Sequence, residues 1–473
     1  MTECNGRTLG FPGIKSREVV ARFDGGTITS DAGGLLLRQA EGATGIVRRF
    51  AECFTDHRDP ELIEHTVEAL VGQRVYGLAL GYEDLNDHDE LRGDPLLAVL
   101  VGKGDPSGQD RVRARDRGKA LAGKSTLNRL ELTPVRANER SRYKKITVNR
   151  RAVEEVFLAV FLEAHPTPPE RIVLDLDATD DPLYGHQSGR FFHGYYMNYC
   201  YLPLYIFAGE HLLCARLRPS DRDGSTGSVG ELDRIVAAIR RRWPEVLIVI
   251  RGDSGFCREP IMVWAETNGV DYVLGLAKNE RLKRELAGAL AEAKAEHERT
   301  GQAARVFADF AYQTLDSWSR PRRVIGKAEY LDKGENPRFV VTSLSDDEFD
   351  ARTVYEDEYC ARGEMENRIK EQQLHLFADR TSAATMRANQ LRLWFSSVAY
   401  ALMLALRRLG LAGTELAHAT CQTIRLKLLK LGAHIRVTCR KVWIALAESY
   451  PYRRLFHQVH ENLRRLAPWR LRR

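Results

Sequence analysis

The stretch IVLDLD at residues 172–177 predicts the fold class of this chain. It is a short run of branched apolar residues, interrupted only by Asp175 and Asp177. Side chains alternate along a strand, so the two acids share one side while apolar residues cover both faces. The stretch therefore predicts a strand buried inside a sheet, with carboxylates at its end.

Strand and helix signals follow this stretch in a regular order. Three strand-like segments, counting the first, precede a helix, and a strand, a second helix and a last strand come after it. This order is that of the RNase H-like fold, in which the first and fourth strands are neighbours. The segments are strands at 172–177, 194–207, 211–217, 246–250 and 272–276, and helices at 229–243 and 260–268.

A second acid follows the fourth predicted strand, and a third lies on a later helix. Asp253 comes directly after the strand VLIVI (246–250), 76 residues beyond Asp177. At about 100° per residue, the helix YCARGEMENRIKEQQ (359–373) places polar residues along one line, beside the apolar stripe Met365, Ile369 and Leu376. That polar line consists of Tyr359, Arg362, Glu366, Lys370 and Gln373.

Three such carboxylates predict a two-metal phosphoryl-transfer site. Two divalent ions about 3.5–4 Å apart activate the attacking oxygen and stabilise the leaving oxygen of an in-line displacement. Mg²⁺ is a hard ion that needs only a few carboxylates. Neighbouring strand ends, about 4.8 Å apart, bring Asp177 and Asp253 within reach of one ion, with Glu366 facing both.

Ordinary structural roles remain open for each acid. Asp177 could cap a strand end and Asp253 could belong to the turn GDSG. Glu366 with Lys370 could form a surface pair one helical turn apart. The choice between Asp175 and Asp177 also stays open, because both project from one face.

The charge distribution predicts contact with a polyanion at two places. The chain carries 71 Lys and Arg against 64 Asp and Glu, but residues 381–473 alone hold 17 against 3. Residues 103–151 hold 15 against 5, so two basic blocks surround an acidic centre. A basic run is often only a solvated face; two of them around an acidic middle favour nucleic acid as the partner.

Other function classes are disfavoured. The N-terminus has no signal-peptide pattern, and the longest apolar run (393–406) covers 14 residues, too few for a membrane span, which predicts a soluble cytoplasmic, nucleoid-associated protein without membrane contact. The 8 cysteines have no paired spacing, which argues against zinc and disulfides. The segment GKALAGKS (118–125) matches a phosphate loop, but RVRARDR before it cannot be the required core strand, so no nucleotide cofactor is expected.

The expected organisation is an α/β chain with an RNase H-like catalytic core, a β-rich insertion and mainly helical flanking regions. We expect five parts along the sequence. They are a mainly helical DNA-binding region at 1–165, the first part of the core at 166–279, a β-rich insertion at 280–355, the core helix carrying the catalytic Glu at 356–380, and a basic helical C-terminal region at 381–473 for DNA binding or dimerisation.

Several ordered motifs resemble one family of enzymes, the bacterial insertion-sequence transposases of the DDE type. The resemblance is to the IS-thirteen-eighty family, a relative of the IS-four group. The matching stretches run nearly from end to end: SDAGGLLLR, LALGYEDLNDHDELRGDP, LAGKSTLNRLE, LDLDATDDPLYGHQ, NYCYLPL, RGDSGFCRE, YCARGEMENRIKE and RANQLRLWFSSVAYALM.

This resemblance implies a DNA transposase that cleaves element ends and joins the freed 3′-OH to target DNA. It places the catalytic and metal-binding acids on Asp177, Asp253 and Glu366, and DNA-binding roles on Tyr359 and Arg362. The related group has Lys seven residues after the Glu. Here that position is Gln373, so the DNA-binding role of the family lysine is assigned to Lys370.

The implied cofactor is Mg²⁺, as two ions, with Mn²⁺ as a substitute. The implied partners are double-stranded DNA, at transposon ends and target, and a second copy in a synaptic homodimer. Two alternatives remain: a metal-dependent nuclease without strand transfer, and a non-catalytic, transposase-derived DNA-binding protein.

Overall fold

The computed structural model describes residues 8–466 and divides the chain into two compact units. The sheet unit comprises Glu131–Thr133 and Val148–Ser397. The terminal unit comprises Met1–Leu130, Pro134–Thr147 and Val398–Arg473. The unit boundaries therefore fall inside the regions predicted as 1–165 and 381–473, each of which contributes to both units.

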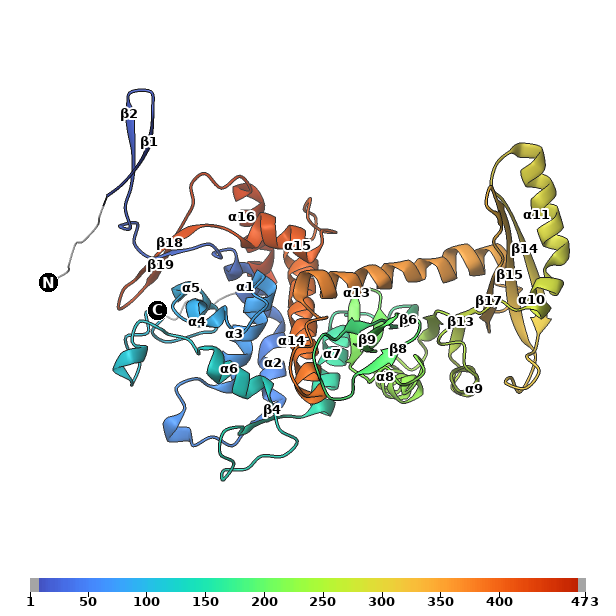
Figure 1. Cartoon of the computed structure of the whole chain (residues 1–473), viewed down its shortest axis with the longest axis horizontal. Coiled ribbons are helices and arrows are strands. Elements are labelled where there is room, and N and C mark those ends of the chain that lie inside the picture. The colour runs from blue at the N-terminus through green and yellow to red at the C-terminus, as the bar shows by residue number, and fades with distance from the viewer. Residues whose placement is uncertain (1–7, 467–473) are drawn as a thin grey trace. The chain divides into compact units, whose positions relative to one another are not determined.

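A nine-stranded mixed sheet forms the centre of the sheet unit (Figure 1). Eight strands lie in the order β11-β10-β6-β12-β13-β17-β15-β14, and β16 pairs with β15. In chain order the strands are β6 (Arg171–Ala178), β10 (Leu204–Ala208), β11 (His211–Arg216), β12 (Leu247–Gly252), β13 (Asp271–Leu276), β14 (Ala304–Tyr312), β15 (Arg322–Leu331), β16 (Gly334–Glu335) and β17 (Arg338–Thr342).

The register of β6 and β12 brings two acids to one edge of this sheet. The two strands are parallel, with Asp175 opposite Arg251 and Leu176 opposite Gly252. Asp177 and Asp253 each come one residue after this last pair of the register. The sequence predicted this neighbour relationship between the first and fourth strands, and the pairing confirms it.

Helices cover the sheet because both of its faces are apolar. One face contributes Leu174, Leu176 and Ile250 to a core that includes residues of α8 and α9. On the other face Val249 and Val273 pack with Val354 of the segment before the Glu366 helix. The helices of this unit are α7 (Arg150–Glu163), α8 (Ser228–Arg242), α9 (Glu259–Thr267), α10 (Glu280–Glu285), α11 (Ala287–Thr300), α12 (Ala351–Thr353), η3 (Val354–Tyr359), η4 (Cys360–Arg362), α13 (Gly363–Leu376) and the first part of α14 (Met386–Ala405).

The segment between β13 and α13 enlarges the main sheet. Its last strand, β17, pairs antiparallel with β13, so β14, β15 and β17 continue the sheet that carries Asp177. Helix α11 lies along β14 and β15 (Figure 1), where Leu290 and Ala293 are buried. Residues 280–355, expected to be a β-rich insertion, contain β14, β15, β16 and β17 as an extension of the central sheet.

The predicted strand at 194–207 is two strands in different sheets. Only β10 belongs to the main sheet, whereas β9 (Asn198–Tyr201) lies between β7 (Asp181–Pro182) and β8 (Phe191–His193) in a small separate sheet. Pro203 interrupts the run between the two strands, because proline cannot donate to a strand ladder.

The terminal unit is built from both ends of the described chain. Strand β18 pairs with β3 from the N-terminal side and with β19. The C-terminal region at 381–473 was predicted to be helical, and this prediction is wrong at the hairpin of β18 and β19. The elements are β1 (Leu9–Ile14), β2 (Arg17–Ala21), β3 (Ile28–Thr29), α1 (Gly34–Thr44), α2 (Ile46–Glu52), β4 (Phe54–Asp56), η1 (Pro60–Leu62), α3 (Val67–Leu80), α4 (His88–Leu91), α5 (Pro95–Leu100), η2 (Ala114–Asp116), α6 (Lys124–Glu131), β5 (Ile146–Val148), η5 (Leu406–Gly410), α15 (Cys421–Ile424), η6 (Arg425–Leu429), β18 (Ala433–Val437), β19 (Val442–Leu446) and α16 (Arg453–Leu466).

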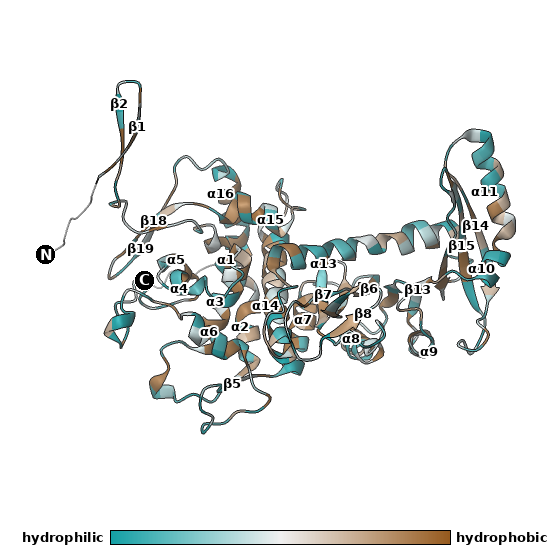
Figure 2. Cartoon of the chain, viewed as in Figure 1, coloured by the Kyte–Doolittle hydropathy of each residue, from teal (hydrophilic) through white to brown (hydrophobic). Residues whose placement is uncertain are grey.

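The phosphate-loop match and the long apolar run were the two sequence features that could have indicated a nucleotide-binding or a membrane protein. Residues 101–123 contain no strand, so the phosphate-loop match at 118–125 lacks the strand that this motif requires. Helix α14 is apolar along much of its length, in contrast to the mainly polar α13 (Figure 2). Within residues 8–466, no helix combines the length and hydropathy needed to cross a bilayer.

Candidate active site

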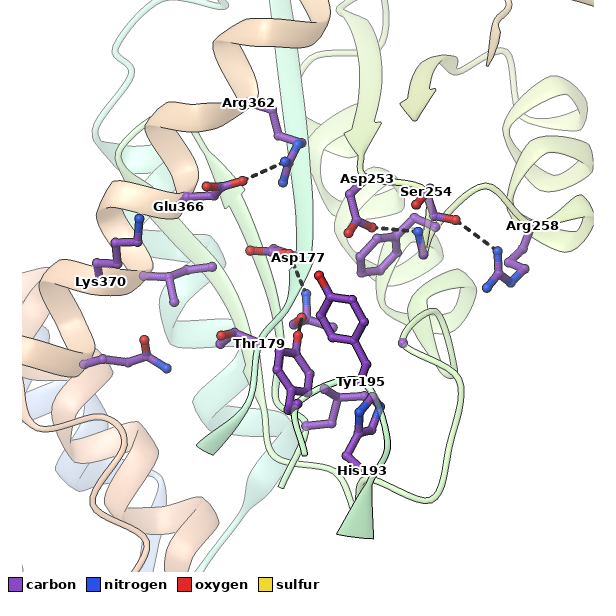
Figure 3. Close-up of a pocket in the computed structure, with 18 residues that line it drawn as sticks. Asp177, Thr179, His193, Tyr195, Asp253, Ser254, Arg258, Arg362, Glu366 and Lys370 are labelled. Atoms are coloured by element: carbon purple, nitrogen blue, oxygen red, sulfur yellow. Dashed lines mark hydrogen bonds and ion pairs between the residues drawn. The ribbon is translucent and has the colours of Figure 1, made fainter. Parts of the chain in front are cut away.

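An open pocket of about 650 Å³ lies at the sheet edge where β6 and β12 end. Asp177, Asp253 and Glu366 all line it, each from a different element (Figure 3). Arg362, Lys370 and Gln373 line it as well. Three acids that are far apart in sequence thus border the same space, as the strand order and helix face predicted.

Asp177 lies near the end of β6 and is half-buried. Its Oδ1 accepts a hydrogen bond from the backbone N–H of Ala178 at 2.9 Å. Burial raises the pKa of Asp177 to about 6, helped by the charges of Asp253 and Glu366 and opposed by Arg362. A buried carboxylate among like charges is one that a bound cation would stabilise.

Asp175 has a different environment from Asp177. Arg251 of β12 holds it in a two-pronged ion pair, with Nε 2.5 Å from Oδ1 and Nη2 2.8 Å from Oδ2. Both side chains are buried and neither lines the pocket. Asp175 is therefore occupied as the partner of a buried arginine, whereas Asp177 faces the pocket.

Asp253 begins a tight turn after β12. Its Oδ1 accepts from the backbone N–H of Gly255 at 2.8 Å. A side chain at Gly275, on the neighbouring strand β13, would place a Cβ 2.5 Å from the hydroxyl of Tyr359 and 3.0 Å from the backbone nitrogen of Ser254. Glycine at 275 therefore lets Tyr359 and the Asp253 turn approach each other closely.

The helix carrying Glu366 is irregular at its start. Residues Val354–Tyr359 form a π-helical turn and Cys360–Arg362 a 3₁₀ turn, before regular α-helix begins at Gly363. Such π-helical turns occur frequently at functional sites. The regular 100° spacing assumed from the sequence consequently holds from Glu366 to Gln373, and not back to Tyr359.

Arg362 pairs with Glu366 at the pocket wall. Its Nη2 lies 2.6 Å from Oε1 of Glu366 (Figure 3). Burial alone would lower the pKa of Arg362, but Glu366, Tyr359, Asp177 and Asp253 raise it. The guanidinium is thus the positive centre of an acidic pocket. Tyr359 lies behind it: burial raises the pKa of its phenol, and its hydroxyl is not part of the pocket wall.

The three acids line the same pocket, but their side chains do not converge on one metal position. Among residues 8–466, no three His, Cys, Asp or Glu side chains are arranged to hold one metal ion. The ion pair with Arg362 engages Glu366, and this explains the incomplete convergence. The donor chemistry still suits a hard cation, since carboxylate oxygens line the pocket and Asp177 is buried beside like charges.

Sequence reasoning missed an aromatic hairpin at the rim of this pocket. Strands β8 and β9 are joined through His193, Tyr195 and Tyr196, which all line the pocket. Tyr195 is 84% exposed, and its ring points into the pocket (Figure 3). Tyr196 fixes the hairpin to β6 by donating to the carbonyl oxygen of Ala178 at 3.1 Å. The run GYYMNYCY was predicted as part of one strand at 194–207, whereas residues 194–197 form an exposed turn before β9.

Arg258 is a further basic residue of the pocket that the sequence did not single out. It pairs with Asp223 at 2.8 Å and donates to the carbonyl oxygen of Ser254 at 3.1 Å. Its position after β12 places a second guanidinium on the Asp253 side of the pocket.

Comparison with known proteins identifies the family. No curated protein matches the chain. Among solved structures, the chain is similar to a piggyBac transposase in a cryo-EM synaptic complex with hairpin DNA, at 11% identity and a TM-score of 0.41, over 94% of this chain and 87% of that one. The family described as "Transposase DDE domain group 1" matches residues 11–468. Because this match spans nearly the whole sequence, the chain belongs to the group 1 family of DDE transposase domains.

Proposed function

We propose that the protein is a DNA transposase with an RNase H-like core, using Asp177, Asp253 and Glu366 as its catalytic triad. It would bind the terminal inverted repeats of an insertion sequence, cleave the element ends and join the 3′-OH to target DNA. The supporting observation is that these three acids, from β6, β12 and α13, line one pocket in a chain of the DDE family.

The cofactor proposed for this pocket is Mg²⁺, as two ions, with Mn²⁺ as a substitute. DDE transposases generally use divalent metal ions. Asp177 and Asp253 would hold them together with Glu366, since Mg²⁺ binds through few carboxylates and completes its shell with water and substrate phosphate. When bound, such ions activate the attacking oxygen and offset charge on the leaving oxygen.

The basic side chains of the pocket would position the DNA backbone. Arg362 and Lys370 line one wall, and Arg258 lies near the Asp253 turn. A guanidinium offers several N–H donors in a fixed plane and suits phosphate oxygens. Arg362 would also hold Glu366 apart from the other acids until a cation enters, because their mutual repulsion is strongest without one.

The aromatic hairpin would contact bases near the cut. Tyr195 offers an exposed ring at the pocket, fixed by the anchor of Tyr196 on β6. Base–aromatic stacking contributes about 1–3 kcal/mol per base and tolerates any sequence. Tyr195 would therefore retain a base that has left the duplex beside the scissile phosphate.

Double-stranded DNA is the proposed partner, and a homodimer pairing two element ends is the proposed assembly. The basic blocks at 103–151 and 381–473 support contact with phosphates outside the pocket. The quoted motifs support membership of the bacterial IS-thirteen-eighty family, which is related to the IS-four group. The protein would then act on nucleoid DNA in the cytoplasm.

Incubation with Mg²⁺ and DNA carrying the terminal repeats of the element tests this function. The expected products are strands cut at the element end and, with target DNA present, joined molecules that contain a new phosphodiester. Cut strands without joined products would establish a metal-dependent nuclease instead. Binding without any cut strand would establish a non-catalytic DNA-binding protein.

A further inference from the structure

A group of buried oxygen atoms includes Oδ2 of Asp181, whose other carboxylate oxygen contacts Gln373. Within the described part of the chain, five of these atoms have no hydrogen-bond partner although each is shielded from solvent. Asp181 and Tyr205 are fully buried and Thr381 is 4% exposed. The five atoms are Oδ2 of Asp181, Oδ1 of Asp379, the hydroxyl of Tyr205, Oγ1 of Thr381 and Oε1 of Gln187.

Electrostatic and hydrogen-bond contacts place these atoms in one region. Among charged groups, Asp379 has the largest effect on Asp181, and both acids act on the hydroxyl of Tyr205. Gln187 donates from Nε2 to the carbonyl oxygen of Thr381 at 3.2 Å. The backbone N–H of Thr381 donates in turn to the carbonyl oxygen of Asp379 at 3.1 Å.

The positive charge near the two acids is small compared with their negative charge. Burial raises the pKa of Asp181 well above its usual range, and no basic group is among those that oppose the rise; only the amide of Gln373 does, at 3.4 Å from Oδ1. Arg380 lies 4.0 Å from Oδ1 of Asp379, and its side chain is 54% exposed. Asp181 is fully buried, and the side chain of Asp379 is 29% exposed with its Oδ1 shielded from solvent. A buried carboxylate without a buried cation is costly unless something offsets its charge.

We propose that Asp181 and Asp379 hold a divalent cation, of the hardness of Ca²⁺, at a site separate from the catalytic pocket. The two carboxylates supply two negative charges, which a divalent ion offsets. The hydroxyls of Tyr205 and Thr381 and the amide oxygen of Gln187 supply neutral oxygens. Ca²⁺ takes six to eight oxygen ligands and accepts carboxylate, amide and backbone carbonyl oxygens together with water. An ion here also accounts for buried polar atoms that the protein leaves unpaired.

The position of this site gives it a structural role. Asp181 follows the strand that bears Asp177, and Asp379 follows the helix that bears Glu366. A shared ion would join the two segments beyond the catalytic acids. Gln373 lies between both places, because it lines the catalytic pocket and contacts Asp181. The ion thus fixes α13 against the end of β6.

Equilibrium dialysis of the full chain against Ca²⁺ tests the proposal without requiring DNA or activity. A chain with Asp253→Asn and Glu366→Gln, which weakens the catalytic site, is expected to retain one bound Ca²⁺ and to melt at a higher temperature in its presence. Adding Asp181→Asn or Asp379→Asn is expected to weaken this binding at least about tenfold. The matched control is Asp332→Asn, whose side chain is 94% exposed and whose change leaves binding unaffected.

Tb³⁺ luminescence excited through tyrosine reports on the same place. Emission from the chain with Asp253→Asn and Glu366→Gln is expected to fall on Tyr205→Phe or Asp181→Asn and to persist on Asp332→Asn. The proposal is overturned if the chain with the weakened catalytic site binds no Ca²⁺. It is equally overturned if Asp181→Asn and Asp332→Asn chains bind Ca²⁺ alike. The first measurement needs no change at Asp181, so a folding defect there cannot hide the answer.

Discussion

Nη2 of Arg362 lies 2.6 Å from Oε1 of Glu366, one helical turn away on the wall of the acidic pocket. The same guanidinium opposes the charge of Asp177 and is itself stabilised by Asp253. One cation therefore balances three carboxylates that belong to three separate elements. The charge of Arg362 therefore affects both the repulsion among the three carboxylates and their ability to bind a cation.

Arg362→Ala is expected to reduce DNA cleavage at least about 100-fold, because the variant loses a fixed donor to the phosphate whose charge develops in the reaction. The free energy of unfolding should change by no more than about 1 kcal/mol, since the pair with Glu366 is partly exposed to solvent. Cleavage rates and urea denaturation measure the two effects. The control is Arg299→Ala, which removes an exposed helical ion pair with Glu296 and should change neither cleavage nor stability. A cleavage rate near the wild-type value for Arg362→Ala would show that Arg362 is not part of the site.

Asp175 and Asp177 are expected to fail in opposite ways when each is changed to Asn. Asp175→Asn leaves Arg251 buried without its charge partner and should lower the free energy of unfolding by about 3 kcal/mol. Asp177→Asn removes a carboxylate whose charged form is disfavoured by burial and by the like charges of Asp253 and Glu366, so the fold should persist while cleavage is lost. Chemical denaturation and a cleavage assay separate the two. An active Asp177→Asn protein would contradict the assignment.

The different roles of Asp175 and Asp177 could be predicted only in part from the sequence. The apolar runs at 172–176 and 246–250 were enough to predict two neighbouring strands, and with them Asp177 beside Asp253. The partner of Asp175 depends on strand register, which places Arg251 opposite it and which no short pattern encodes. Arg362 and Glu366 lie four residues apart on the predicted polar line, and their ion pair has the spacing of a regular helix. The π-helical and 3₁₀ turns before Gly363 were not predicted.

Other differences arise where local composition is ambiguous. The hairpin of β18 and β19 lies in a basic, apolar region whose residues fit a helix as well as a strand, and its pairing with β3 decides the outcome. The aromatic run around Tyr195 has the composition of a core strand, and yet its turn is exposed. Tertiary contacts, which a single sequence does not display, determine both cases.

Gly275→Ala is expected to disturb the pocket through the Asp253 turn. The added methyl group would lie 2.5 Å from the hydroxyl of Tyr359 and 3.0 Å from the backbone nitrogen of Ser254, so one of them must move. Overpacking of this kind costs about 1–3 kcal/mol of stability. Activity should fall more than stability does, and Tyr359→Phe in the same chain should recover part of the stability. A Gly275→Ala protein with full activity would show that the turn tolerates displacement.

Tyr195→Ala is expected to weaken the retention of DNA with unpaired bases at the cut end roughly tenfold, through loss of one stacking platform. Binding of fully paired DNA should change little, and so should the melting temperature, because the ring is 84% exposed. A fluorescent base analogue at the cut end reports stacking directly. Tyr184→Ala is the matched control: this ring is 93% exposed and lies outside the pocket wall. Equal effects of the two substitutions would contradict a specific role for Tyr195.

Asp253→Ala tests the central claim, a phosphoryl-transfer site made from three separated acids, most directly. The measurement is cleavage of terminal-repeat DNA in Mg²⁺, with binding of the same DNA followed in parallel. Loss of cleavage with largely intact binding is the predicted result, because Asp253 lines the proposed catalytic pocket and the proposed phosphate contacts lie in the basic blocks. Cleavage at the wild-type rate by the Asp253→Ala protein would contradict it.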